Sequence, residues 1–208
     1  MDMNYDLYTM CIMTAVIAFL GFCLENAWLA VTKGYMDNRG MRAPFLLGYG
    51  GLVMGMYLLL GTPSDMVIAG SYEVWLDPEK ENICYFLCTF LIVSIGEIIL
   101  GTAVKKFCGM DYWDYTWIPM HITKYTSVPT SIGFGLIITH FMGKVFTPLM
   151  GLLSTISHES AQGLAIALSA VMIMDFIGAF RTMRKTGEPL KLWQLTLKHQ
   201  LRLPVFRR

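Results

Sequence analysis

Long apolar segments alternate with short polar ones, and this alternation dominates the chain. Five segments approach or exceed the roughly 20 apolar residues that a helix needs to cross about 30 Å of hydrocarbon. Since backbone polar groups in lipid must be satisfied within the segment, each is predicted to be a helix. Residues 1–180 are therefore predicted to form an all-α, polytopic membrane helix bundle with about five transmembrane helices: Leu7–Val31, Phe45–Gly61, Ile83–Val104, Val128–Met142 and Ala161–Phe180.

Two further stretches follow this pattern less closely. Val145–Ile156 is interrupted by Pro148, and it fits either a kinked extension of the fourth helix or a re-entrant piece. Residues 181–208 form a basic tail, and within it, from Gly187 to Arg208, apolar side chains recur at helical intervals with basic residues between them. This spacing predicts a basic amphipathic helix lying on the cytoplasmic face of the membrane. Its apolar positions are Leu190, Trp193, Leu197 and Leu201.

Composition and charge support a membrane protein and suggest its orientation. Hydrophobic residues make up 55% of the chain, and the mean hydropathy is +0.51, which excludes an ordinary soluble domain. Of the 16 Lys and Arg residues, all but Lys80 and Lys144 lie in residues 31–44, residues 105–127 and the tail after Phe180. By the positive-inside rule, this predicts a multi-pass protein of the plasma membrane with its N-terminus outside and its C-terminus in the cytoplasm.

The chain also contains an internal repeat. In each copy a carboxylate precedes a loop lysine by eight residues, and a proline then opens a helix that carries Gly-aromatic-Gly. The copies cover residues 7–61 and 83–142, with the helix at 161–180 as an addition. Because each copy returns the chain to its starting side, the copies are expected to be related by an axis along the membrane normal. The anchors are Glu25, Lys33, Pro44 and Gly48–Gly50 in the first copy, and Glu97, Lys105, Pro129 and Gly133–Gly135 in the second.

Three carboxylates in the apolar segments are the first candidates for a functional site. Glu25, Glu97 and Asp175 are predicted to lie at similar depth in the inner leaflet, where an ionised acid is costly. They could bind a cation, relay protons, or pair with Arg39 or Arg42 from the loop, and such a pair would keep a carboxylate ionised. Hydrogen bonding between helices is the structural alternative.

Polar residues near these acids complete the candidate site. Asn26 follows Glu25 directly, and Asn38 with Arg39 offers an amide and a guanidinium at the depth of the lipid headgroups. Arginine can hold a carboxylate or a phosphate by two parallel hydrogen bonds. Asp114 lies in the aromatic and acidic loop 111–117, which could receive a cytoplasmic partner or close over a site.

Several chemistries have no signature in the sequence. Gly143-Lys144 is followed by Val145 rather than Ser or Thr, so no phosphate-binding loop is formed, and neither a nucleophile elbow nor a dinucleotide fingerprint occurs. The five cysteines and four histidines show no metal-ligand spacing. No cofactor or metal is expected, and any ATP hydrolysis must come from another chain.

Both copies of the repeat contain short sequence motifs. They are Glu25, Asn38-Arg39-Gly40, Pro44 and Tyr49-Gly50 in the first copy, and Glu97, Trp113-Asp114-Tyr115 and Pro129 in the second. In these motifs the chain resembles a family of small polytopic proteins described as putative ABC-transporter type IV. The resemblance covers roughly residues 15–142 and implies a membrane-embedded transport component.

Three functions remain open at this point. The first is a permease-like transporter subunit whose substrate passes the clustered carboxylates, working with a separate ATPase subunit and, because the bundle is small, as a homodimer or with another partner. The second is an intramembrane enzyme acting on a lipid or lipid-linked group, with a carboxylate as general base and Arg39 holding phosphate. The third is a scaffold or regulator that does not transport. None of them involves nucleic acid.

Overall fold

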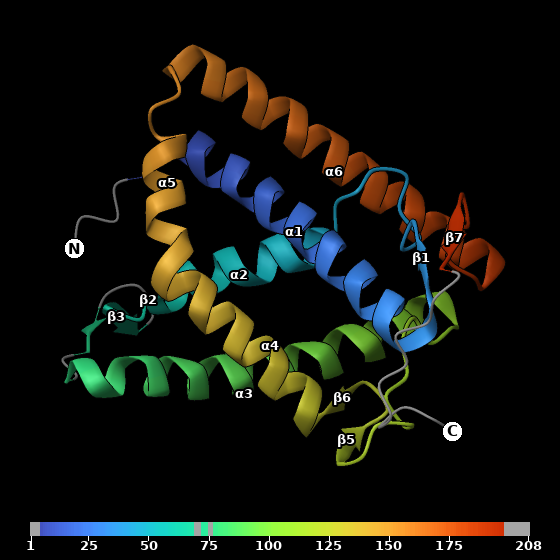
Figure 1. Cartoon of the computed structure of the whole chain (residues 1–208). Coiled ribbons are helices and arrows are strands. Elements are labelled where there is room, and N and C mark those ends of the chain that lie inside the picture. The colour runs from blue at the N-terminus through green and yellow to red at the C-terminus, as the bar shows by residue number, and fades with distance from the viewer. Residues whose placement is uncertain (1–4, 69–71, 75–76, 198–208) are drawn as a thin grey trace. The chain divides into compact units, whose positions relative to one another are not determined.

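A computed structural model describes residues 5–68, 72–74 and 77–197 of the protein (Figure 1). The chain is mostly helical, which confirms the predicted fold class. A six-residue π-helix, Phe141–Phe146, joins α4 to α5, so that residues 128–153 form one continuous helix. The α-helices are α1 Leu7–Lys33, α2 Leu47–Leu60, α3 Pro78–Cys108, α4 Val128–His140, α5 Thr147–Leu153 and α6 His158–Thr186.

Four of these helices are long and apolar enough to cross a membrane: α1, α3, the continuous helix Val128–Leu153, and α6. The second predicted span is shorter than the sequence suggested, because α2 has 14 residues and therefore extends only about 21 Å. α2 begins at Leu47 rather than Phe45, and Leu46 N donates to the Ala18 carbonyl of α1 at 3.0 Å. Residues 41–46 consequently form a loop rather than the first turn of that span.

Short antiparallel strands lie in the loops and at the helix ends. β1 pairs with β7, β2 with β3, β3 with β4, and β5 with β6. Each pairing joins only a few residues, so these strands fix loop conformations and do not build a sheet layer. The strands are β1 Tyr35–Asp37, β2 Gly61–Thr62, β3 Asp65–Ile68, β4 Tyr72–Glu73, β5 His121–Thr123, β6 Thr126–Ser127 and β7 Gln194–Thr196.

The chain divides into two compact units, which are described separately. The first, called the α1–α6 unit, comprises residues 7–52 and 157–208. In Figure 1, α1 (blue) and α6 (orange) run side by side within this unit. The Tyr8 ring contacts the His158 ring near the start of both helices, with centroids 5.3 Å apart, while β1 and β7 pair beyond their ends. The two helices are therefore parallel.

The second, called the α3–α4 unit, comprises residues 1–6 and 53–156 and is built on the packing of α3 against α4. Local signals fix the ends of α3. Pro78 lies in its first turn with Glu79 and Glu81, where acidic groups favour the positive end of the helix dipole. Gly109 ends the helix with φ 73°, and its N–H donates to the Lys105 carbonyl.

The structure settles how Val145–Ile156 continues the fourth helix. The π-helix ends at Phe146, two residues before Pro148, and α5 continues to Leu153. Proline removes one backbone donor and collides with the carbonyl four residues earlier, so widening the preceding turn accommodates it without breaking the helix. Residues 145–153 are thus an extension of α4, and the re-entrant alternative is not observed in this described segment.

The amphipathic tail helix is not formed in the described part of the tail. α6 ends at Thr186, and Gly187 caps it with φ 70°. Residues 188–197 then run back along the first loop, where Tyr35 pairs with Thr196 and Asp37 with Gln194. The helical prediction is wrong here because the spacing of apolar side chains was counted without the backbone partners that β1 provides. Leu201 and the rest of 198–208 lie outside the described residues.

Candidate functional site

In the α1–α6 unit, Glu25 is the centre of a small polar cluster. It lies two turns before the end of α1, and its carboxylate accepts a hydrogen bond from the Tyr49 hydroxyl of α2. The Arg39 Nη2 atom lies 3.3 Å from Glu25 Oε2, and both side chains are largely buried, at 14% and 19% exposure. Arg39 Nη1 also lies 3.6 Å from Asp37 Oδ1. One carboxylate thus links α1, the following loop and α2.

The backbone of the loop brings Arg39 back to α1. Gly34 ends α1 with φ 74°, and its N–H donates to the Leu29 carbonyl. Arg39 itself has φ 48°, followed by Gly40 with φ 73°. A left-handed conformation is uncommon for a residue with a side chain, and here the Asp37 carboxylate stabilises it by accepting from Arg39 N at 2.8 Å. The chain reverses at this point, which directs the guanidinium toward Glu25.

Two buried asparagines hold this loop in place. Asn26 Oδ1 accepts from Asp37 N at 2.8 Å. Asn38 is 3% exposed, and its amide bonds to the carbonyls of Met41 and Leu190 and to the N–H of Leu192. Each amide can therefore satisfy backbone groups that would otherwise be buried without partners. Asn26 and Asn38 thus position the loop and the tail.

Asp175 of α6 anchors the next part of the loop. Its carboxylate accepts hydrogen bonds from Arg42 N at 3.0 Å and from Ala43 N at 2.8 Å. Asp175 is 8% exposed, so these backbone donors compensate the cost of burying it. The expected pairing of an acid with a loop arginine is confirmed for Glu25 and Arg39, whereas Asp175 uses the Arg42 backbone.

The α3–α4 unit contains a corresponding acid with different partners. Glu97 Oε2 accepts from the Thr126 hydroxyl at 2.7 Å. Thr126 Oγ1 lies 3.0 Å from Ser131 Oγ, and Ser94 of α3 donates to Ser131 at 2.9 Å. This chain of hydroxyls joins α3 to β6 and α4. Glu97 therefore joins a network of hydroxyls, whereas Glu25 lies beside a guanidinium.

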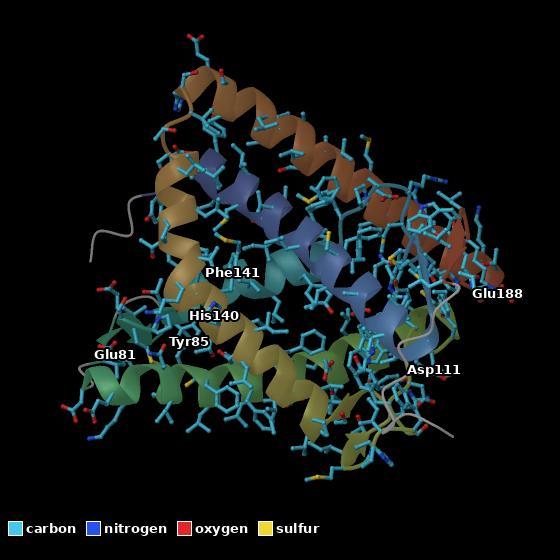
Figure 2. The ribbon with its side chains drawn as sticks, in the orientation of Figure 1. Glu81, Tyr85, Asp111, His140, Phe141 and Glu188 are labelled. Atoms are coloured by element: carbon cyan, nitrogen blue, oxygen red, sulfur yellow. The ribbon has the colours of Figure 1, made fainter. Side chains whose placement is uncertain are left out.

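The aromatic loop is an internally bonded structure. Asp111, labelled in Figure 2, lies 2.7 Å from Lys124 Nζ and 3.1 Å from Lys105 Nζ, and Tyr125 donates to it at 2.7 Å. Asp114 accepts from Thr116 N at 2.7 Å, which forms an Asx turn. Hydrogen bonds from Lys124, Tyr125 and Lys105 hold the pKa of Asp111 well below its usual range. The bond from Thr116 lowers the pKa of Asp114.

A pH prediction follows from Asp111. Its pKa is depressed by folding, so its contribution to stability is complete above about pH 4 and is lost only as the pH falls through the depressed value. We expect the near-ultraviolet circular dichroism of the loop tryptophans to stay unchanged between about pH 7 and pH 5. Asp111→Asn should reduce this signal across the same range, whereas Glu79→Gln, on an exposed helix end, should not. An equal effect of both variants would contradict the role assigned to Asp111.

Sequence reasoning found some residues of this cluster and missed others. Within the α1–α6 unit, five of the predicted site residues either belong to the loop after α1 or bond to it. They are Glu25, Asn26, Asn38, Arg39 and Asp175. The convergence of Glu25, Glu97 and Asp175 on one layer stays a prediction. Residues that the sequence analysis did not assign to the site are Asp37, Tyr49, Thr126, Ser131 and Ser94. Asp37 beside Asn38 and the aromatic residue inside Gly-aromatic-Gly were the available signals.

Comparisons with known proteins point to one family. The family model described as "Putative ABC-transporter type IV" matches residues 12–180, which is most of the chain. The match includes α1 from Ile12 onward, all of α2 and α3, and the three carboxylates Glu25, Glu97 and Asp175. No curated protein and no solved structure matches the chain.

Proposed function

We propose that this chain, which belongs to the Putative ABC-transporter type IV family, is the permease-like subunit of a transporter and carries its polar site at Glu25. The observation that supports this most directly is the ion pair between Glu25 and Arg39 inside an apolar helix bundle. Ionisable groups within membrane spans commonly mark substrate or ion pathways. The substrate would pass this pair, and ATP hydrolysis would come from a separate subunit.

The geometry of the pair suits a switch. Glu25 bonds to groups from two other segments, Tyr49 of α2 and Arg39 of the loop. Asp37 offers the guanidinium a second carboxylate. Arg39 could therefore leave Glu25 without losing all compensation for its charge, and Glu25 would then be free to take a cationic group or a proton. Such a change needs only a small free-energy difference between two arrangements.

The packing within the α1–α6 unit supports five crossings of the membrane. Since α1 and α6 are parallel, the chain between them must cross an odd number of times. α3 and the helix 128–153 supply two crossings, so α2 must supply the third. The pairing of β1 with β7 also puts the first loop and the tail on one side, as the positive-inside rule predicts for the cytoplasm. We place the N-terminus outside, in a plasma-membrane protein.

Equivalent contacts within each unit support the proposed duplication. Gly50 contacts Thr14 and Ala18, which lie eleven and seven residues before Glu25. In the second copy Gly135 contacts Phe86 and Phe90, which lie eleven and seven residues before Glu97. The second glycine of each Gly-aromatic-Gly thus meets the same two positions of the preceding helix. A shared ancestor for residues 7–61 and 83–142 explains this correspondence.

The test is to isolate the tagged full-length chain from its native membrane in mild detergent. We expect vanadate-sensitive ATP hydrolysis to purify with it, carried by a second polypeptide, because this sequence has no phosphate-binding loop. Compared with wild type at equal amounts of isolated complex, Glu25→Gln should abolish the substrate-dependent part of that hydrolysis. Turnover of lipid by the purified chain alone, with no associated ATPase, would reject the transporter and favour the intramembrane enzyme.

A further inference from the structure

Arg42 is an exposed arginine whose guanidinium contacts α6. Asp175 fixes its backbone, as described above, and its side chain extends toward the C-terminal end of the helix. A Cβ atom added to Gly178 would lie 2.9 Å from Arg42 Nη1. Because Gly178 has no side chain, the guanidinium of Arg42 can occupy the space beside it. In the described part of the chain this guanidinium forms no hydrogen bond or ion pair.

Two further cations share this face of α6. Arg181 and Lys185 follow Gly178 by three and seven residues, so they lie on the same side of the helix. Both are exposed, and neither pairs with an acid among the described residues. Toward the helix start, the same face carries Val171 and Met174, which are 42% and 65% exposed. An exposed apolar surface therefore leads directly to three cations.

We propose that Arg42, Arg181 and Lys185 bind the phosphate of an anionic phospholipid, with an acyl chain lying along Val171 and Met174. A guanidinium matches phosphate geometry by two parallel hydrogen bonds. Basic groups at the end of a membrane helix recognise anionic headgroups in this way. The exposed apolar surface favours a lipid over free phosphate as the ligand. Only a lipid has both a phosphate for the three cations and an acyl chain to cover the apolar surface.

Neighbouring acids leave this site positively charged. Asp175 lies on the same side of α6, one turn before Gly178, but it is buried and its oxygens accept from the backbone of Arg42 and Ala43. Glu188, labelled in Figure 2, lies beyond the end of α6 and pairs with Lys191. Arg39 is a weaker phosphate ligand than the sequence suggested, since Glu25 and Asp37 already neutralise it.

The experiment uses the purified full-length protein in neutral detergent, with bound lipid counted by native mass spectrometry. The probes are phosphatidylglycerol, phosphatidylcholine of the same chain length, and inorganic phosphate. We expect phosphatidylglycerol to bind in preference to phosphatidylcholine. The double variant Arg42→Gln with Arg181→Gln should weaken phosphatidylglycerol binding about tenfold, corresponding to roughly 1.4 kcal/mol. Phosphate alone should not displace the lipid.

Two variants distinguish lipid binding at this site from long-range electrostatic attraction between the protein and anionic lipid. Gly178→Leu keeps every charge but fills the space of the guanidinium, so it should weaken binding of phosphatidylglycerol. The double variant Lys106→Gln with Lys144→Gln removes the same charge from exposed positions of the α3–α4 unit, and it should bind as wild type does. Arg181→Gln alone, at an exposed position, tests the site if Gly178→Leu does not fold.

The results that overturn the proposal are distinct from those that reject transport. Equal losses in the Arg42/Arg181 and Lys106/Lys144 variants would show long-range attraction only. Displacement of the lipid by inorganic phosphate would show a free-anion site. Lipid binding does not depend on ATP hydrolysis, so the site at Arg42 stands or falls independently of the transport function proposed for Glu25.

Discussion

Gly50→Ala is expected to destabilise the protein by about 3 kcal/mol, the upper part of the range for overpacking a close contact. A Cβ atom at Gly50 would collide with the Thr14 backbone carbonyl and with the Thr14 methyl group. A backbone atom within α1 cannot rotate away as a side chain can. The new methyl group must therefore push α2 away from α1, close to the bond between Tyr49 and Glu25.

The adjacent glycine provides the matched control. A Cβ atom at Gly51 would meet nothing within 4 Å. Because alanine is the better helix former, Gly51→Ala should stabilise the protein by about 0.5–1 kcal/mol. The two variants thus make the same chemical change at neighbouring positions of one helix and have opposite expected signs. Equilibrium unfolding in mixed micelles, followed by far-ultraviolet circular dichroism, measures both.

The second copy of the repeat gives an intermediate case. A Cβ atom at Gly135 would lie 2.9 Å from Phe86 Cε2, an atom of a ring that can shift. Gly135→Ala is therefore expected to cost about 1 kcal/mol. Equal stability changes at Gly50, Gly51 and Gly135 would show that these contacts do not determine the packing.

The sequence predicted the helices better than the loops, for a physical reason. Apolar length is a local property, so α1, α3 and α6 could be read directly from it. The sequence also indicated Glu25 and Arg39, because a buried acid needs compensation and a loop arginine is close in sequence. α2 was predicted too long because the apolar residues Phe45 and Leu46 were counted as helix, whereas both lie in the loop before it.

Local sequence patterns could not predict contacts between segments that lie far apart in the chain. Asn38 bonds to Leu190 and Leu192, more than 150 residues away, and β7 exists because β1 supplies its partners. The apolar spacing from Leu190 to Leu201 resembles a helix, yet the described part of the tail pairs with the first loop. Tyr49 was likewise identified only as the aromatic residue of the repeated Gly-aromatic-Gly, since nothing near it in sequence indicates a hydrogen bond to Glu25.

A second large loss of stability is expected when the ion pair between Glu25 and Arg39 is broken. Glu25→Gln takes the nearer carboxylate away from Arg39, and Asp37 Oδ1 lies 3.6 Å from Nη1. Removing one member of a largely buried pair leaves the other charge poorly compensated. We expect a loss of about 2 kcal/mol for Glu25→Gln and for Arg39→Gln. This is less than for a fully buried pair, because Asp37 and partial exposure relieve part of the cost.

A double-mutant cycle tests whether the pair acts as one unit. If each variant mainly removes the same interaction, the double variant should cost little more than either single change, giving a coupling of about 2 kcal/mol. The matched control is the pair between Lys80 and Asp77, which is 69% and 71% exposed. Its coupling should be below about 0.5 kcal/mol, because solvent screens an exposed pair. Equal coupling in the two cycles would contradict the burial argument.

Stability and function can be separated at this pair. Arg39→Lys keeps the charge but loses the planar fork that reaches Glu25 and Asp37 together. If the folded protein needs only a positive charge beside Glu25, Arg39→Lys should keep most of the stability that Arg39→Gln loses. If release of Arg39 controls the pathway, substrate-dependent ATP hydrolysis by the isolated complex should still change, because a lysine holds the two carboxylates differently. Restored stability together with unchanged hydrolysis would make Glu25 and Arg39 a structural pair, and the pathway would then lie elsewhere in the bundle.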